Sequence, residues 1–201
     1  TINYIVPDAA LFQKMSFTDL SKGFYAPPEA FHRVYLGRFL PTDCRRVINL
    51  EVDILVRGDI AELFEVDLGG KTIGVVADCY QYQEERQKYF RKLCQEINWP
   101  LPPKGAAYFS VGMLLVDLER WRKRGVEEKL LEVIYKYPDK LYFHENDALN
   151  IVLADDFKEL PPKYHLLTEQ VAAGQVDRRD CPDPLIVHFV GGGKPWYFLS
   201  A

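Results

Sequence analysis

The stretch "RRVINLEVDILVRGDI" (45–60) governs the interpretation of the whole chain. Its middle is rich in branched apolar residues, as in a strand buried on both faces. Glu51 and Asp53 interrupt this run, and side chains two apart on a strand point to the same face. We therefore expect two carboxylates side by side in a buried element, which is unfavourable unless something positive compensates them.

Two kinds of compensation fit the acid pair. A divalent cation is one, because carboxylate oxygens are the ligands that Mg²⁺ and Mn²⁺ prefer. The other is a purely structural pair held by arginines, for which Arg45, Arg46 and Arg57 are near in sequence. Acid-x-acid triplets are common, so the motif alone leaves both possibilities open.

The pattern on either side of this stretch predicts an α/β fold with one domain over the 201 residues. Apolar segments that we interpret as strands alternate with helical patterns, which indicates a mainly parallel, mixed sheet flanked by helices, similar to a Rossmann fold. The other expected strands are 2–6, 71–78, 106–118 and the start of 183–196. The expected helices are 27–41, 58–64, 83–99, 119–137 (one or two helices) and 144–154.

Charge, hydropathy and cysteine spacing indicate which partners and which compartment suit the chain. The net charge of −4 argues against nucleic acid as a partner, and no apolar stretch approaches the roughly 20 residues of a membrane span. Four widely spaced cysteines fit free thiols in a reducing, cytoplasmic compartment. The basic run "RWRKRG" (120–125) is expected to be a solvated helix end packed through Trp121, with contact to an anionic membrane surface as the alternative.

The segment "HFVGGGKPW" (188–196) is a second candidate for chemistry. His188 ends a predicted strand, and imidazole suits Mn²⁺-like metals. Lys194 supplies a point charge for phosphate. Glycine lets backbone N–H groups approach an anion closely, and three stand in a row, Gly191, Gly192 and Gly193. The alternative is a β-turn in which the histidine and lysine occur by chance.

The segment "HENDALN" (144–150) has two interpretations. Its polar residues suit a helix N-terminus, where they cap backbone N–H groups and complement the helix dipole. Alternatively, Glu145 and Asn146 face a polar ligand while Asp147 supports the turn.

Several single residues have plain default roles. Arg33 is by default a surface arginine, Asp78 a strand-end acid, and Ser110 a hydroxyl bonded to backbone. His32, His144 and His165 show no ligand spacing.

The order of these motifs resembles glycosyltransferase family eight over about residues 2–198. That family includes bacterial lipopolysaccharide glucosyl- and galactosyltransferases as well as glycogenin. The resemblance implies a GT-A fold and a retaining transfer of a hexose from UDP-glucose or UDP-galactose to a glycan or glycolipid acceptor. It also implies Mn²⁺ (or Mg²⁺) as cofactor and a place at the cytoplasmic face of the membrane.

The resemblance also assigns site residues. It implies that Glu51, Asp53 and His188 bind the cation and that Gly191 and Lys194 bind the diphosphate. It places Arg33, Asp78 and Ser110 at the donor sugar, and Glu145 and Asn146 nearest the reacting carbon. Glu51 and Ser110 stand where the family usually has Asp and Asn.

The resemblance leaves alternatives. The expected domain, 1–201, starts later than family members do, without their N-terminal nucleotide-binding segment, so we expect this chain alone to bind UDP-sugar weakly. A non-catalytic relative acting as a binding or interaction module is the main alternative. A metal-dependent phosphohydrolase or nucleotidyltransferase is a more distant one.

Overall fold

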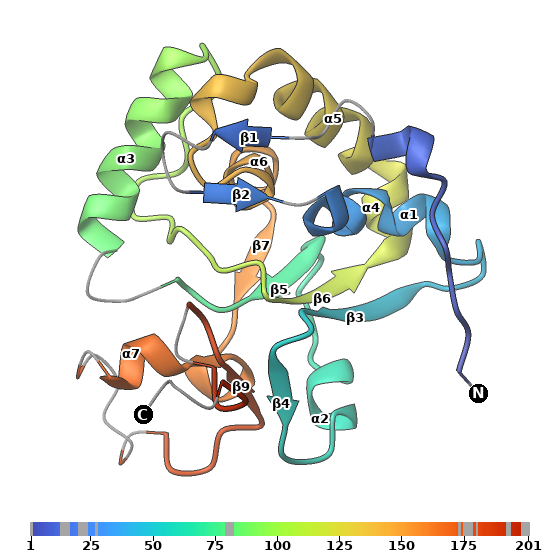
Figure 1. The fold of residues 1–201 in the computed structure, drawn as a ribbon, viewed down its shortest axis with the longest axis vertical. Coiled ribbons are helices and arrows are strands. Elements are labelled where there is room, and N and C mark those ends of the chain that lie inside the picture. The colour runs from blue at the N-terminus through green and yellow to red at the C-terminus, as the bar shows by residue number, and fades with distance from the viewer. Residues whose placement is uncertain are drawn as a thin grey trace.

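The computed structural model describes residues 2–12, 17–19, 24–26, 28–78, 83–172, 174, 179, 181–191 and 194–197, which form a mixed α/β structure (Figure 1). The strands are β1 (Phe17–Asp19), β2 (Phe24–Ala26), β3 (Arg46–Leu50), β4 (Ile54–Val56), β5 (Ile73–Val75), β6 (Met113–Asp117), β7 (Phe157–Glu159), β8 (Leu166–Leu167) and β9 (Ile186–His188). The helices are α1 (Leu36–Phe39), α2 (Ala61–Phe64), α3 (Gln83–Glu96), α4 (Leu118–Lys123), α5 (Val126–Lys136), α6 (Glu145–Val152) and α7 (Thr168–Ala172). 3-10 turns occur at Ala9–Phe12, Pro28–Tyr35, Pro138–Lys140 and Pro162–Tyr164.

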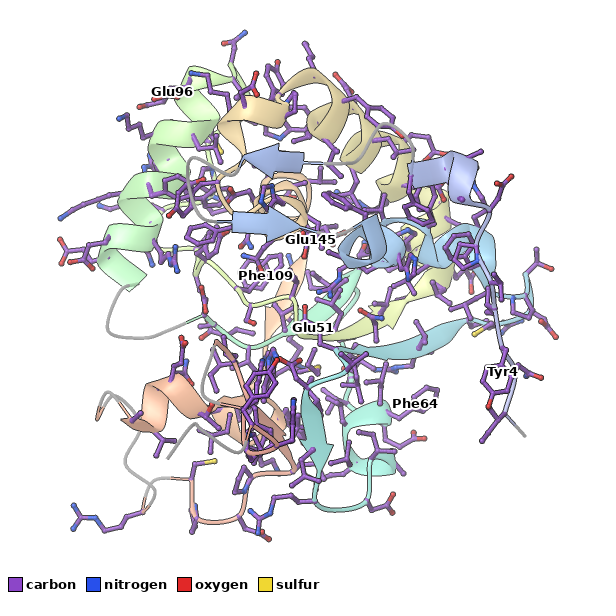
Figure 2. The ribbon with its side chains drawn as sticks, viewed as in Figure 1. Tyr4, Glu51, Phe64, Glu96, Phe109 and Glu145 are labelled. Atoms are coloured by element: carbon purple, nitrogen blue, oxygen red, sulfur yellow. The ribbon has the colours of Figure 1, made fainter. Side chains whose placement is uncertain are left out.

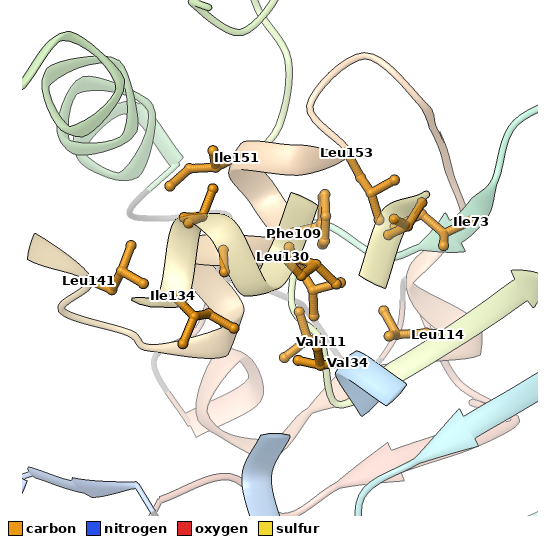
Figure 3. Close-up of a cluster of buried hydrophobic side chains, with 14 of the residues drawn as sticks. Val34, Ile73, Phe109, Val111, Leu114, Leu130, Ile134, Leu141, Ile151 and Leu153 are labelled. Atoms are coloured by element: carbon orange, nitrogen blue, oxygen red, sulfur yellow. The ribbon is translucent and has the colours of Figure 1, made fainter. Parts of the chain in front are cut away.

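Strand β6 is the centre of the fold. It lies in a four-stranded sheet of order β3-β6-β5-β7, and all of its apolar side chains are fully buried. Because side chains alternate across a strand, Leu114 and Val116 enter one core while Met113 and Leu115 enter another. The first core packs against α3, α5 and α6 (Figure 3), and the second against α2 and the segments beside β9. One apolar strand thus joins both cores.

A second sheet lies below the first and has the order β4-β9-β8 (Figure 1). Ile54 pairs with His188 in the antiparallel β4–β9 ladder, and Leu167 pairs with His188 in the parallel β8–β9 ladder. His188 therefore has a paired strand on each side, which fixes its backbone. A separate antiparallel pair, β1–β2, lies among the upper helices.

The chain between β3 and β4 differs from the prediction of one continuous strand. Residues Glu51, Val52 and Asp53 form a break at which the chain leaves the first sheet and enters the second. Val52 is fully exposed, whereas the side chains of Glu51 and Asp53 are only 30% and 18% exposed. The acids share a turn rather than a strand face, because β3 pairs with β6 and β4 pairs with β9.

The mixed, helix-flanked sheet is confirmed, but the expectation of mainly parallel strands is wrong for the described pairs. Only β5–β7 and β8–β9 are parallel among them, and β3–β6, β5–β6, β4–β9 and β1–β2 are antiparallel. Burial on both faces reflects the layers that cover a sheet and does not depend on strand direction. The apolar pattern of β6 therefore predicted its burial correctly without predicting its direction.

Several element boundaries also differ. Residues 2–6 were expected to form a strand, but they run along the outside of the molecule without regular structure, with Tyr4 89% exposed (Figure 2). The strand expected over 106–118 is regular only at β6, and 106–112 has no regular structure beyond one bridge between Ala77 and Phe109. The pattern over 119–137 forms two helices that are separated at Gly125, whose φ is +60°. The short strands β7 and β8 and helix α7 were not predicted.

The basic run at 120–125 is solvated in part, with Lys123 and Arg124 exposed, and its arginines also make structural contacts. Trp121 is buried, as expected. Arg120 and Arg124 approach the buried carboxylate of Asp156. The Arg122 guanidinium donates to backbone carbonyls at the end of α1 and just beyond it, those of Gly37, Leu40, Pro41, Thr42 and Cys44. The three arginines of the run thus contact other segments of the protein from its surface.

Two further sequence expectations can be compared with the described residues. Cys44, Cys94 and Cys181 are free thiols, and Cys79 lies outside those residues. Within the described part of the chain, no helix has both the length and the apolarity that crossing a membrane requires.

Replacing Arg122 by alanine should destabilise the fold. The side chain satisfies carbonyls at a helix end that otherwise have no intrahelical partner, and hydrogen bonds from a charged donor are the stronger kind. We expect a loss of about 2 kcal/mol of unfolding free energy, or roughly 4–8 °C in Tm for a chain of this size. The matched control is Lys123→Ala in the same helix, on an exposed side chain, which should change stability by less than about 0.5 kcal/mol. Equal effects of the two substitutions in thermal unfolding would contradict this role.

Candidate functional site

The break at 51–53 brings together three side chains that are far apart in sequence. His188 Nε2 lies 3.1 Å from Asp53 Oδ1 and 3.1 Å from Glu51 Oε2. One ligand atom of each residue lies within 4.8 Å of the others. Backbone hydrogen bonds fix this geometry, since Glu51 N donates to Gly112 O and Phe189 N donates to Asp53 O. Figure 2 places Glu51 at the centre of the molecule, between its upper and lower parts.

Glu51 is held by donors on two sides. Arg33, which is almost fully buried, donates to Glu51 Oε1 at 2.6 Å and to the carbonyl of Val111 at 2.5 Å. Burial alone would raise the pKa of Glu51, but the hydrogen bonds from His188 and Arg33 outweigh it and lower the pKa to about 2. Glu51 is therefore ionised at neutral pH. The default expectation of a surface arginine at Arg33 is wrong, because Arg33 forms part of the site.

Asp53 is compensated by Lys194. The ammonium group donates to Asp53 Oδ2 and to the carbonyl of Phe189. The lysine side chain is only 16% exposed. Two of the arginines expected to hold the acid pair have other partners: Arg46 binds the carbonyl of Val66, and Arg57 lies near Asp183. The positive groups around the pair are Arg33 and Lys194 instead.

Behind His188 lies a second buried histidine. His165 Nε2 is 2.8 Å from His188 Nδ1, and the two ring planes are nearly parallel, with an angle of 20° between them. Burial, and the proximity of His188, lower the pKa of His165 to about 3, so that it is neutral. Gly112 faces both rings, and a Cβ at this position would lie 2.4 Å from His188 Cε1. The absence of a side chain at Gly112 is therefore what leaves room for the pair.

The first turn of α6 carries a buried carboxylate. Asp147 accepts hydrogen bonds from the hydroxyls of Tyr89 and Tyr108 at 2.6 Å each and from Phe143 N at 2.8 Å. The bond to Phe143 N closes the helix start, as expected for Asp147. Burial raises the pKa of Asp147 despite these donors. His144, just before the helix, has a φ of +48°, which is uncommon outside glycine.

Asn146 links this helix to the acid pair. Its side-chain oxygen accepts from Val111 N at 3.1 Å, and its amide nitrogen donates to Tyr108 Oη at 2.7 Å. The same Val111 accepts from Arg33 through its carbonyl. Hydrogen bonds thus run from α6 through residue 111 to Arg33 and Glu51. The place of Asn146 beside the reacting carbon stays a prediction.

Glu145 has the unusual titration in this region. Burial raises its pKa to about 7, although the charge of Arg33 acts in the opposite direction. The half-buried carboxyl lies at the start of α6, close to Glu51 in the centre of the molecule (Figure 2). A carboxyl that titrates near pH 7 within a cluster of charges is typical of a functional site.

Asp78 and Ser110 form a neighbouring group. Ser110 N donates to Val76 O and Asp78 N donates to Tyr108 O, so segments 76–78 and 108–110 lie side by side. Asp78 Oδ2 lies 3.5 Å from Arg86 Nε. Ser110 lies within the 108–112 segment, which also contacts Asn146 and Arg33, and Asp78 is hydrogen-bonded to that segment. Their contact with a donor sugar remains a prediction.

The glycine-rich turn is only partly described. Gly191 has a φ of +74°, a backbone conformation that favours glycine, and a Cβ there would lie 2.3 Å from Glu169 Oε1, so the Glu169 side chain would have to move. Gly192 and Gly193 lie outside the described residues. Diphosphate binding by Gly191 stays a prediction.

The residues present fit a divalent cation of the Mg²⁺ or Mn²⁺ type. The set contains two carboxylates and one imidazole, with O and N donors converging from one turn and one strand. The two carboxylates face each other, and the pKa of Glu51 is lowered to about 2. A cation would neutralise the negative charge that they supply.

Sequence reasoning missed His165 and Gly112. His165 was set aside because it has no ligand spacing, yet it touches a candidate ligand. The signal that was available is a histidine among apolar residues in "YHLL" (164–167), where a buried imidazole needs a polar partner.

Comparison with known proteins identifies the family of the chain. The profile of Glycosyl transferase family 8 matches residues 3–199. General stress protein A of Bacillus subtilis (strain 168) is 32% identical over 83% of this chain and 58% of its own length. Probable galacturonosyltransferase-like 7 of Arabidopsis thaliana is 32% identical over 87% of this chain and 49% of its own. The lipopolysaccharide 1,2-glucosyltransferase of Escherichia coli (strain K12) is 25% identical over 83% of this chain and 48% of its own length.

Solved structures share the fold. The galactosyltransferase LgtC, in complex with donor and acceptor sugar analogues, superimposes with a TM-score of 0.69 at 24% identity over 87% of this chain and 63% of that one. GlyE of Streptococcus pneumoniae TIGR4 superimposes with a TM-score of 0.64 at 22% identity, over 85% of this chain and 40% of that one. The chain spans about half the length of the curated relatives it matches. On the strength of the family match, the chain belongs to glycosyltransferase family eight and has a GT-A fold.

Proposed function

We propose that the chain is the metal-binding part of a retaining glycosyltransferase that transfers a hexose from a UDP-sugar, UDP-glucose or UDP-galactose, to a carbohydrate or glycolipid acceptor. The observation that supports this most is the convergence of Glu51, Asp53 and His188 beside Lys194. Four groups of this chemistry at one point suit a cation and a diphosphate together. We further propose that residues 1–201 act as one domain, at the cytoplasmic face of the membrane.

The site's own residues have separable roles in this proposal. Glu51, Asp53 and His188 hold the cation, preferably Mn²⁺, which supplies positive charge to a departing diphosphate. Lys194, with the backbone at Gly191, binds the diphosphate from the side of β9. Arg33 orients Glu51 and contacts the donor sugar, together with Asp78 and Ser110.

The start of α6 faces the sugar in this proposal. Asn146 lies nearest the reacting carbon and Glu145 contacts the sugar. A neutral amide is a poor nucleophile, so we favour a front-face substitution in which the departing phosphate accepts the proton of the acceptor hydroxyl. Because the transfer retains the anomeric configuration, a donor with an α-linked sugar gives an α-linked product.

The proposal predicts metal-dependent release of UDP. The protein is incubated with Mn²⁺ and a panel of UDP-sugars, and UDP is measured. Asp53→Asn removes one ligand charge and should lower UDP release by at least about tenfold and weaken Mn²⁺ binding in calorimetry. The control is Asp59→Asn, because Asp59 only accepts from Ala61 N in a turn, and asparagine can do the same. UDP release that is unaffected by EDTA and by Asp53→Asn would reject the metal role.

A chain that binds UDP and Mn²⁺ at this site without turnover of any donor sugar would instead favour the binding-module alternative. Proton NMR of the product gives the anomeric configuration. A β-linked product would rule out the retaining mechanism.

Lys194→Ala should separate the nucleotide from the metal. Without the ammonium group, UDP binding in the presence of Mn²⁺ should weaken by about 1.5–3 kcal/mol, or roughly 10- to 150-fold. Binding of Mn²⁺ alone should not weaken, because Lys194 competes for Asp53. Lys88→Ala, on the exposed face of α3, is the control. Unchanged UDP affinity in calorimetry would exclude the diphosphate role.

Glu145 should make stability depend on pH. Its folded-state pKa of about 7 exceeds the ordinary value, so the folded protein binds the proton more tightly. The stabilisation is full below about pH 4.5 and is lost as pH rises to about 7. Relative to wild type, Glu145→Gln should therefore gain roughly 3 kcal/mol of unfolding free energy between pH 4.5 and pH 8. Urea titrations in EDTA at each pH measure the difference in unfolding free energy between Glu145→Gln and wild type, in which the contributions of other groups cancel. A difference that does not change with pH would contradict the raised pKa.

A further inference from the structure

Tyr108 is a fully buried tyrosine that the roles proposed above do not use. It lies in the segment between α3 and β6, and its ring packs edge-on against Phe90, with the ring centroids 5.7 Å apart. Its hydroxyl donates to Asp147 Oδ1 at 2.6 Å and accepts from Asn146 Nδ2 at 2.7 Å. Packing therefore holds the ring, and two consecutive residues of α6 hold the hydroxyl.

The hydrogen bonds of Asn146 fix the direction of its side-chain amide. A backbone N–H can only donate, so the atom that lies 3.1 Å from Val111 N is the amide oxygen. An amide nitrogen can also only donate, so Tyr108 Oη is the acceptor at the other end. An amide turned by 180° would set N–H against N–H at Val111. The amide thus has one orientation, which two contacts define.

The backbone that receives Asn146 is itself attached to α6. Asn150, one turn later and fully buried, accepts from Phe109 N at 2.8 Å and donates to Phe109 O at 2.9 Å. Its amide nitrogen also lies 2.9 Å from Asn146 O, to which it donates. Two asparagines four residues apart lie on one face of a helix. They hold the segment that contains Phe109 and Val111, so Val111 N is a fixed point for the Asn146 amide.

Part of the Asn146 amide remains available to a ligand. A side-chain amide has two N–H groups and two lone pairs on its oxygen. Val111 N uses one lone pair and Tyr108 Oη uses one N–H. Within the described residues no other group engages the second N–H or the second lone pair, and Asn146 is only half-buried. These two groups are what Asn146 can present to a bound sugar.

We propose that Tyr108 is a positioning residue for the transfer, whose hydroxyl fixes the plane of the Asn146 amide so that its remaining N–H and lone pair meet the reacting sugar in one direction. With the contact to Val111 N alone, the amide could turn about that hydrogen bond, and the contact to Tyr108 removes this freedom. Polar groups that are oriented before the substrate binds need no reorganisation during the reaction. Tyr108 acts through Asn146 and does not contact the substrate. This inference rests on the proposed place of Asn146 beside the reacting carbon.

Tyr89 offers a matched comparison for this role. Its hydroxyl donates to Asp147 Oδ2 at 2.6 Å and accepts from Tyr142 N at 3.3 Å. Both tyrosines therefore donate to the same carboxylate and accept an N–H, but only the N–H that Tyr108 accepts belongs to Asn146. If the hydroxyls serve only to hold Asp147, removing either one should have the same effect. If Tyr108 positions Asn146, its removal alone should change the reaction.

The test replaces each tyrosine by phenylalanine, which keeps the ring and removes the hydroxyl. UDP release is measured with Mn²⁺ and the donor sugar that the wild-type protein uses. We expect Tyr108→Phe to lower kcat at least about tenfold while KM stays within about twofold of wild type, because the loss concerns orientation in the reaction rather than binding. Tyr89→Phe should keep kcat within about threefold of wild type. Equal losses in the two variants would overturn the positioning role.

Proton–nitrogen NMR of the Asn146 side-chain amide gives a readout that is independent of activity. Its signals are assigned by their loss in Asn146→Ala, and the protein is studied without metal or nucleotide. In wild type, the two Nδ2 protons should exchange with solvent at different rates, because Tyr108 accepts one of them. In Tyr108→Phe the two rates should become similar and the signals should shift. Tyr89→Phe should leave both signals unchanged.

An Asn146 spectrum that is the same in Tyr108→Phe and wild type would contradict the proposal. If Tyr108→Phe does not fold, the wild-type exchange rates decide, since equal rates for the two Nδ2 protons would equally overturn it. A wild-type protein that turns over no donor sugar would reject the proposed function separately, and the amide spectra would still decide whether Tyr108 holds Asn146.

Discussion

The repulsion between two carboxylates in one turn is the constraint on which this site depends. Glu51 and Asp53 are brought together where the chain passes from one sheet to the other, and like charges at this distance are unfavourable without partners. The fold supplies one cationic group to each acid, Arg33 to Glu51 and Lys194 to Asp53, and His188 Nε2 lies 3.1 Å from a carboxylate oxygen of each. These partners come from a 3-10 turn, a strand and a loop, so the site exists only in the folded chain.

Much of the fold follows from the sequence because burial leaves a clear pattern. The fully apolar run of β6, the helix starts and the strand that carries His188 were predicted from that pattern. The break at Val52 was not, because a branched residue looks the same in a strand and in an exposed turn. Strand direction and the two-residue strand β8 depend on pairing with distant segments, which periodicity does not record.

The residues that form the site could be predicted from the sequence, whereas the contacts that they make with other residues could not. The motif order named Glu51, Asp53 and His188, and the structure brings them together. Arg33 was expected on the surface or at a sugar, yet it binds Glu51 and Val111. His165 and Gly112 act through space alone, one by touching His188 and the other by having no side chain where the rings lie. The apolar surroundings of His165 in the sequence indicate a buried imidazole, but they do not indicate which side chain it contacts.

The position of Lys194 implies coupling between the two ligands that the site is proposed to bind. In the described structure its ammonium group neutralises Asp53. A cation that binds Asp53 replaces that partner, and the lysine charge is then directed to an anion such as a diphosphate. Each ligand thereby improves the site for the other, and linkage requires the effect to be equal in both directions. The Lys194 ammonium group thus stabilises Asp53 while the site is empty. Its replacement by a metal ion favours binding of the metal and the nucleotide together.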